Sequence, residues 1–446
     1  MAQDNAAAQL VGNIFKTPEL KSRIGFTLLA LIIYRVGSHI TAPGIDTQAL
    51  IDFFKSQQAG GLLGLYDLFV GGGLSRATLF ALGIIPYISA SIVFQILAAV
   101  LPSVEKLQRE EQGRKKVEQW TRYMTVGISI MQAWGYALFT ESLQGAVAHP
   151  GMAFRIQMTL FLTAGAIFVM WLGEQITDRG VGNGASLLIF FSIIERFWPA
   201  IVQTFGFLST GALSPFKLLI LGLVMVGVVA GTVAITVAAR RVPIQIPQRS
   251  MARGRQRESS KNFIPLRMVA ANVMPIIFAQ TVIVVPGTLA QFGSRAPWAQ
   301  SMAEILNPGT WEYYVLMTIL ILFFTYFYTA IIFNPIDIAE NLKKQGGFIP
   351  GVKPGAKTAE YIEKVMSRIT FPGAVFLALI ALLPIWISDL INVPFRFGGT
   401  SLLIVVGVGL DTLAQLQQHL YLRKYDGFMK KGRIRLRGRQ GAPGGF

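Results

Sequence analysis

The stretch FALGIIPYISASI, residues 80–92, is apolar enough for a membrane, yet it carries a proline, Pro86, at its centre. Ile84, Ile88 and Ile92 recur every four residues, so on a helix they form one stripe. A proline inside a helix removes a backbone hydrogen bond and bends the chain. The stretch therefore predicts a kinked membrane helix with isoleucines along one face.

The composition of the whole chain agrees with a membrane protein. Of its 446 residues 52% are hydrophobic and only 14% are charged, whereas soluble proteins carry about 25% charged residues. Apolar runs of about 20 residues recur, enough to cross a hydrocarbon core about 30 Å thick. Cysteine is absent, which excludes disulfides and thiol chemistry. The three histidines, His39, His149 and His419, lie far apart in the sequence, which argues against a metal cluster.

The hydropathy pattern predicts ten membrane spans. Lys and Arg concentrate in the N-terminal arm, in the second, sixth and eighth connections and in the tail, whereas the odd-numbered connections hold only Lys55, Arg76, Arg295 and Arg396. By the positive-inside rule both termini are cytoplasmic. The spans are expected near 24–40, 77–101, 123–144, 154–176, 184–207, 215–239, 269–291, 312–335, 369–389 and 401–421.

Two echoes in the sequence indicate an internal repeat. GNGASLLIF at 182–190 opens the fifth span, and GGTSLLIVV at 398–406 opens the tenth. Pro86 in the second span likewise has a counterpart in the seventh, Pro275. The echoes lie five spans apart, and because five is odd the two halves must have opposite orientations in the membrane. Such an inverted repeat places a pathway at the interface between the halves. The expected halves are residues 1–210 and 211–446, the second with cytoplasmic loops at 240–268 and 336–368 and a basic tail at 422–446.

Isoleucines occupy equivalent places in the two halves. Side chains from four helices are expected to converge into an apolar ring, which can close a pore to ions by dewetting. Ordinary helix packing is the alternative interpretation, because isoleucine is common in membranes. The isoleucines concerned are Ile84, Ile88, Ile189, Ile277 and Ile404.

A second feature precedes the proline-containing span. The segment GGLLGLYDLFVGGG, residues 60–73, has an apolar core from Leu62 to Val70 between glycines. As a helix it is about 14 Å long, too short to span a bilayer. A hinged plug on the external side is one interpretation, and a re-entrant or interfacial segment is the other.

Charged residues within the spans are few. The interior candidates are Arg35, Glu195, Arg196 and Asp411. We expect the first three to pair or to reach towards the membrane surface. A small-solute transporter would need a charged midplane. An intramembrane protease would need a paired catalytic constellation, and Asp411 has no evident twin. Neither a phosphate-binding glycine loop nor a metal motif is present in the sequence, so no enzyme activity and no cofactor are expected.

Long motifs identify a family. GGGLSRATLFALGIIPYISASI, MWLGEQITDRGVGNGASLLIF, FYTAIIFNPIDIAENLKKQGGFIPGVKPG and VPFRFGGTSLLIVV resemble the SecY family, the channel subunits of bacterial protein translocases, over nearly the whole chain. The resemblance implies an all-α polytopic membrane protein of ten helices in two inverted five-helix halves, with a closed waist and a plug. The implied ring adds Ala185 to the five isoleucines.

The resemblance also implies a plug and a lateral gate between spans two and three on one side and spans seven and eight on the other. The implied plug residues are Leu62, Leu63, Leu65, Tyr66, Leu68, Phe69 and Val70. The implied gate residues are Gln95, Asn272 and Gln280, for which ordinary interhelical hydrogen bonding is the alternative.

The implied partners follow from the family. They are the SecE and SecG subunits, the SecA motor ATPase, the ribosome, signal peptides with unfolded preproteins, and anionic lipids, all at a bacterial plasma membrane. Docking of motor or ribosome is expected at the basic loops. There Lys353 stands where the family usually has arginine, so a compact ammonium group replaces a planar guanidinium. The expected docking residues are Arg249, Arg253, Arg255 and Lys353.

Overall fold

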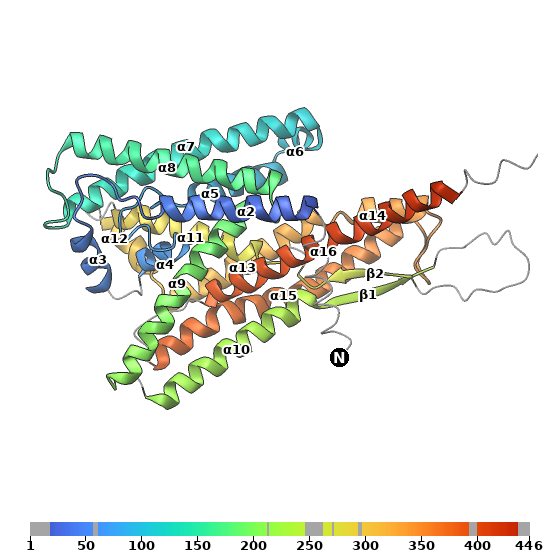
Figure 1. Cartoon of the computed structure of the whole chain (residues 1–446). Helices are drawn as coiled ribbons and strands as arrows, with labels where there is room; N and C mark the ends of the chain where they lie inside the picture. The colour runs from blue at the N-terminus through green and yellow to red at the C-terminus, as the bar shows by residue number, and fades with distance from the viewer. Residues whose placement is uncertain are drawn as a thin grey trace, which may run out of the picture.

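The structure is a computed structural model that is almost wholly helical (Figure 1). It describes residues 18–56, 61–211, 214–245, 262–269, 272–292, 297–391 and 399–435.

Ten long helices within the described ranges correspond one to one to the ten predicted spans. Three of them, α7, α15 and α16, extend well beyond the predicted span. The ten are α2 (Pro18–Gly37), α5 (Ile85–Val100), α7 (Glu111–Ser142), α8 (Met152–Arg179), α9 (Gly184–Ser209), α10 (Pro215–Val237), α11 (Met274–Phe292), α13 (Trp311–Ile332), α15 (Ala356–Ile391) and α16 (Gly399–Arg435).

Within the part of the chain that the structure describes, six helices are long and apolar enough to cross a membrane by themselves, or seven if α5 and the next short helix count as one span bent by 112°. The other long helices carry charges or polar residues. Helix α2 holds Lys21, Arg23 and Arg35, and α9 holds Glu195 and Arg196. Charged residues inside a bundle usually face one another or the interior. The chain is a multi-pass membrane protein.

The two diagnostic prolines begin helices, which corrects the predicted kinks. Helix α5 starts at Ile85 with Pro86 in its first turn, and α11 starts at Met274 with Pro275 next. Proline suits the first turn because the N–H that it lacks has no partner there. The segment 71–84 before α5 is a series of turns, with left-handed backbone at Ala77 and Gly83.

Several short elements lie towards the ends of the bundle, whereas α4 lies inside it (Figure 1). Helices α3 and α12 lie near one end, whereas the hairpin and α14 project beyond the other. The antiparallel strands pair Val242 with Ile264. The elements are α3 (Thr47–Ser56), α4 (Leu62–Phe69), α6 (Pro102–Arg109), α12 (Pro297–Ile305), α14 (Pro335–Lys344), β1 (Ala239–Ile244) and β2 (Asn262–Arg267).

The packing order of the first five long helices recurs in the last five. Helix α2 packs on α8 and α9, α5 on α7, α7 on α8, and α8 on α9. Five helices further on, α10 packs on α15 and α16, α11 on α13, α13 on α15, and α15 on α16. The two groups meet where α11 contacts α5 and α7 and where α9 contacts α16. The short helix α4 lies at this junction, against both α9 and α11.

A second, smaller apolar core joins the hairpin to α14 and the start of α15. Its members include Val242 of β1, Leu266 of β2, Leu342 of α14 and Ile362 of α15. A backbone bridge between Gln245 and Phe348 links the sixth and eighth connections directly. The two basic loops therefore share one folded base.

Candidate functional site

A cavity of about 500 Å³ opens where helices of the two groups meet. Its lining comes from α5, α6, α7, α8, α9, α11 and α13. Four of the six predicted ring residues line it: Ile88, Ala185, Ile189 and Ile277. These four come from three helices, α5, α9 and α11, so residues of both helix groups line the same cavity.

The remaining two ring residues are buried nearby. Ile84 is 4% exposed and Ile404 is fully buried, and both belong to the apolar core that contains the other isoleucines. Ile84 packs closely on Gly173 of α8: a Cβ added to Gly173 would lie 2.9 Å from the Cδ1 atom of Ile84. These two isoleucines are not part of the cavity lining.

Charged side chains line another part of the cavity. Arg122 of α7 donates to Glu174 of α8 over 2.9 Å, and Glu118, Asp178 and Arg114 lie on the same lining. The hydrogen bond to Glu174 raises the pKa of Arg122, so the guanidinium stays charged. The cavity thus combines charged side chains with an apolar portion to which the isoleucines contribute.

Helix α4 is a buried element and does not lie on the molecular surface. Leu62 is fully buried, and Tyr66 is 2% exposed. The Tyr66 hydroxyl donates to the Leu82 carbonyl over 3.0 Å. Leu62 sits against Gly287 of α11, where a Cβ would approach its Cδ1 to 2.5 Å. Of the seven predicted plug residues, Leu62, Leu65, Tyr66, Phe69 and Val70 are buried, and Leu63 and Leu68 are half-buried.

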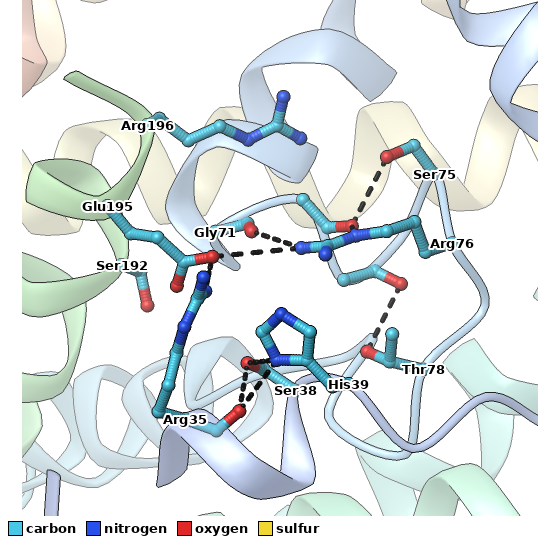
Figure 2. Close-up of polar contacts among 12 residues, drawn as sticks. Arg35, Ser38, His39, Gly71, Ser75, Arg76, Thr78, Ser192, Glu195 and Arg196 are labelled. Atoms are coloured by element: carbon cyan, nitrogen blue, oxygen red, sulfur yellow. Dashed lines mark hydrogen bonds and ion pairs between the residues drawn. The ribbon is translucent and has the colours of Figure 1, made fainter. Parts of the chain in front are cut away.

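Charged groups gather beside α4 (Figure 2). Glu195 of α9 lies between two guanidinium groups, forming an ion pair with Arg35 of α2 and approaching Arg76 to 3.8 Å. Arg196 forms an ion pair with Asp67 of α4. The expected pairing of Arg35, Glu195 and Arg196 is confirmed. Sequence reasoning missed Asp67 as a partner, although it is the one charged residue of an otherwise apolar helix.

One predicted gate residue bridges the two helix groups. Gln95 of α5 accepts a hydrogen bond from the Tyr328 hydroxyl of α13 and donates to Ser91 over 2.8 Å. The Tyr328 ring also contacts Phe278 of α11 edge-on, with 4.8 Å between ring centroids. Tyr328 was not predicted, because no local pattern distinguishes it from the other aromatic residues of its helix.

The other two predicted gate residues have different surroundings. Asn272 donates to Asp411 of α16. Gln280 is 1% exposed, and neither atom of its amide has a hydrogen-bond partner among the described residues. Asp411, one of the interior charges singled out in the sequence, therefore accepts a hydrogen bond from an amide.

Of the predicted docking residues Lys353 alone lies within the described ranges. It is exposed, at the bend between α14 and α15, and its carbonyl accepts from the Thr358 hydroxyl over 2.9 Å. Arg249, Arg253 and Arg255 lie outside the described residues.

The fold matches those of protein-conducting channels. A solved structure of a protein-conducting channel superposes with a TM-score of 0.65 at 16% identity, covering 89% of this chain and 92% of that one. Sec61 in a canine ribosome–channel complex from the endoplasmic reticulum gives 0.61 at 15% identity, over 89% and 92%. The yeast Ssh1 complex bound to the 80S ribosome gives 0.58 at 14% identity, over 96% and 94%. The chain thus shares the fold of these membrane channels.

Sequence comparison then gives the family. The SecY family matches residues 78–413. The protein translocase subunit SecY of Aquifex aeolicus is 43% identical over 426 residues, 94% of this chain and 98% of that protein. The SecY subunit of Escherichia coli K12 is 41% identical over 428 residues, 94% and 96%. The chain belongs to the SecY family and is a channel subunit, not an enzyme.

Proposed function

We propose that the chain is the central pore of a Sec translocase, through which unfolded secretory polypeptides cross the plasma membrane of a bacterium. The observation that carries the proposal is the junction of the two helix groups. There the isoleucines Ile88, Ile189 and Ile277 line a cavity that also carries charged side chains, and helix α4 packs against α9 and α11.

The ring acts as a seal without charged gates. Its five isoleucines are each at most 5% exposed, and Ala185 is half-buried. A narrow apolar constriction excludes ions by dewetting. Because an apolar ring makes no directed hydrogen bonds, it accepts segments of arbitrary sequence. Helix α4 is the plug, and its burial between α9 and α11 supports this role.

The seam between α5 and α13 is the side exit. The Gln95–Tyr328 hydrogen bond and the Phe278 ring contact join the two groups there. Signal peptides and membrane segments leave through this seam into lipid. In this proposal Gln280 and Asn272 do not join the two halves. Gln280 is buried on α11, and Asn272, just before α11, donates to Asp411 of α16 in the same half.

Two halves of opposite orientation, residues 1–210 and 211–446, underlie this arrangement. The recurring packing order supports the division, because consecutive spans alternate in direction and helices five apart then run oppositely. Both termini lie in the cytoplasm, as the distribution of Lys and Arg favours.

The driving force comes from partners. The related channels include two ribosome complexes, and we assign the same partner to the shared base of the two basic loops. SecA docks on the same surface. SecE and SecG join the chain in a heterotrimer, and anionic lipids contact the basic cytoplasmic rim. Lys353 presents its charge on this base.

A crosslinking experiment tests the pathway. A photoreactive amino acid replaces Ile189 or Ile277 in the reconstituted translocase, and a secretory chain is stalled in transit. The matched control is Leu223 of α10, which is 71% exposed on the outside of the bundle. We expect capture at the two ring positions and none at Leu223. Equal capture at all three, or none at the ring, contradicts a central pore.

A further inference from the structure

The loop that follows α4 is surrounded by five charged side chains to which the pore, plug and side exit give no role. They come from α2, α4, the segment after α4, and α9. The five are Arg35, Asp67, Arg76, Glu195 and Arg196.

Asp67 attaches α4 to α9. Its side chain is 7% exposed, and Arg196 donates to its Oδ2. The other carboxylate oxygen accepts the backbone N–H of Ser75 over 2.8 Å, and the Asp67 carbonyl accepts that of Gly72 over 2.7 Å. A carboxylate so deeply buried is stable only while its charge is matched, so Arg196 is its essential partner.

Glu195, the preceding residue of α9, attaches the loop itself. It pairs with Arg35 and approaches Arg76 to 3.8 Å. Arg76 in turn donates to the carbonyls of Gly71 and Gly72, over 3.0 and 2.9 Å (Figure 2). Consecutive residues of one helix thus hold both α4 and the loop that ends it.

The glycines of the loop are a second, independent sign of this fit. Gly71 and Gly72 have φ of 69° and 82°, a region that favours glycine. A Cβ on Gly72 would lie 2.5 Å from an Arg196 nitrogen, and one on Gly71 would lie 3.4 Å from a Glu195 oxygen. The backbone at Gly71 and Gly72 therefore lies so close to Glu195 and Arg196 that a side chain at Gly72 would collide with Arg196.

We propose that Glu195 and Arg196 form a latch that holds α4 in its closed position, and that the Asp67–Arg196 ion pair is the contact that must break before α4 can leave. Arg196 is a positioning residue, since it acts on the pore through α4. The latch rests on the proposed function of α4 as the plug. Burial and the neighbouring Arg196 charge lower the pKa of Arg76, so the three guanidinium groups repel one another and depend on the two carboxylates. When Asp67 departs, Arg196 loses its carboxylate partner and this balance is lost.

Hydrogen–deuterium exchange of the backbone amides at 62–73 tests the latch in the whole channel in lipid nanodiscs. Arg196→Gln removes the charge while keeping a polar side chain. We expect at least about tenfold faster exchange in this segment, which corresponds to a loss of about 1.4 kcal/mol. The conservative Arg196→Lys should retain most of the protection.

Arg155→Gln is the matched control. Arg155 of α8 pairs with Glu141 of α7 over 2.6 Å, with side-chain exposures of 34% and 12%, close to the 36% and 7% of Arg196 and Asp67. This ion pair does not involve α4, so the control should leave exchange at 62–73 unchanged. Equal acceleration by both variants overturns the latch, and so does exchange at the wild-type rate in Arg196→Gln.

A double-mutant cycle separates the latch from general destabilisation. Asp67→Asn keeps the acceptor for the Ser75 amide but removes the charge. If the two residues act as one contact, the double variant should exchange no faster than the faster single variant. Additive effects, or acceleration that spreads to residues 158–173 of α8, contradict a local latch. Because exchange is measured without any substrate, the result does not depend on the crosslinking test of the pathway.

Discussion

The side exit offers a sharp test, because one hydroxyl group joins its two sides. Tyr328→Phe removes the donor to Gln95 and keeps the ring that packs edge-on against Phe278 at 4.8 Å. No cavity forms, since the ring volume is retained. The Gln95 oxygen loses its partner across the seam, whereas its amide nitrogen keeps Ser91.

The size of the effect follows from the value of such contacts. Side-chain hydrogen bonds inside membrane proteins contribute about 0.6 kcal/mol on average and about 1.7 kcal/mol at most. The ratio of open to closed seam should therefore rise by about 3-fold, with an upper bound of about 20-fold.

Spin labels measure this ratio directly. The chain has no native cysteine, so cysteines introduced at Val100 and Ile332 label the exposed ends of α5 and α13 without background. Double electron–electron resonance in nanodiscs should show a larger long-distance population in Tyr328→Phe. The matched control is Tyr326→Phe, because the Tyr326 hydroxyl points to the Ser367 carbonyl of α15, 3.4 Å away, and not across the seam. An unchanged distribution in Tyr328→Phe, or the same shift in both variants, refutes the role of this hydrogen bond.

Three further predictions concern the seal, the docking base and the packing. Serine at the five ring isoleucines should wet the constriction and raise resting ion conductance in planar bilayers; unchanged conductance counts against a seal at this ring. Reversing the charges of Lys353, Arg253 and Arg255 should weaken motor binding to the channel in neutral-lipid nanodiscs, while Lys353→Arg should be tolerated. Equal motor binding by the wild type and the triple reversal would mean that these charges only set the membrane topology. Gly165→Ala should lower the thermal stability of the purified channel, because its Cβ would lie 1.8 Å from a backbone carbonyl oxygen. Gly127→Ala should not, since no atom lies within 4 Å of its Cβ. Equal melting temperatures of the two variants would contradict this packing.

Local chemistry in the sequence was sufficient for the membrane spans and for the residue types of the site. Hydropathy depends on each segment alone, so ten apolar segments predicted the ten long helices. The echoes at 182–190 and 398–406 located isoleucines at equivalent places. For Ile88, Ile189 and Ile277 the structure confirms that they lie together around one cavity.

Backbone chemistry was misjudged at the two prolines. In isolation, Pro86 and Pro275 predict kinks within long spans. In the structure each proline occupies a first helical turn, and the residues before Ile85 form turns around α4. The choice depends on what the preceding segment packs against, which hydropathy does not contain.

Pairing between distant segments was decided by tertiary structure. Arg196 meets Asp67 across 129 residues and Tyr328 meets Gln95 across 233, and the hairpin joins the eighth connection through Gln245 and Phe348. A sequence shows that a buried charge needs a partner, because an unpaired charge in a bilayer is costly. Which partner it finds depends on how the helices pack, since only packing brings side chains from different spans within hydrogen-bond distance.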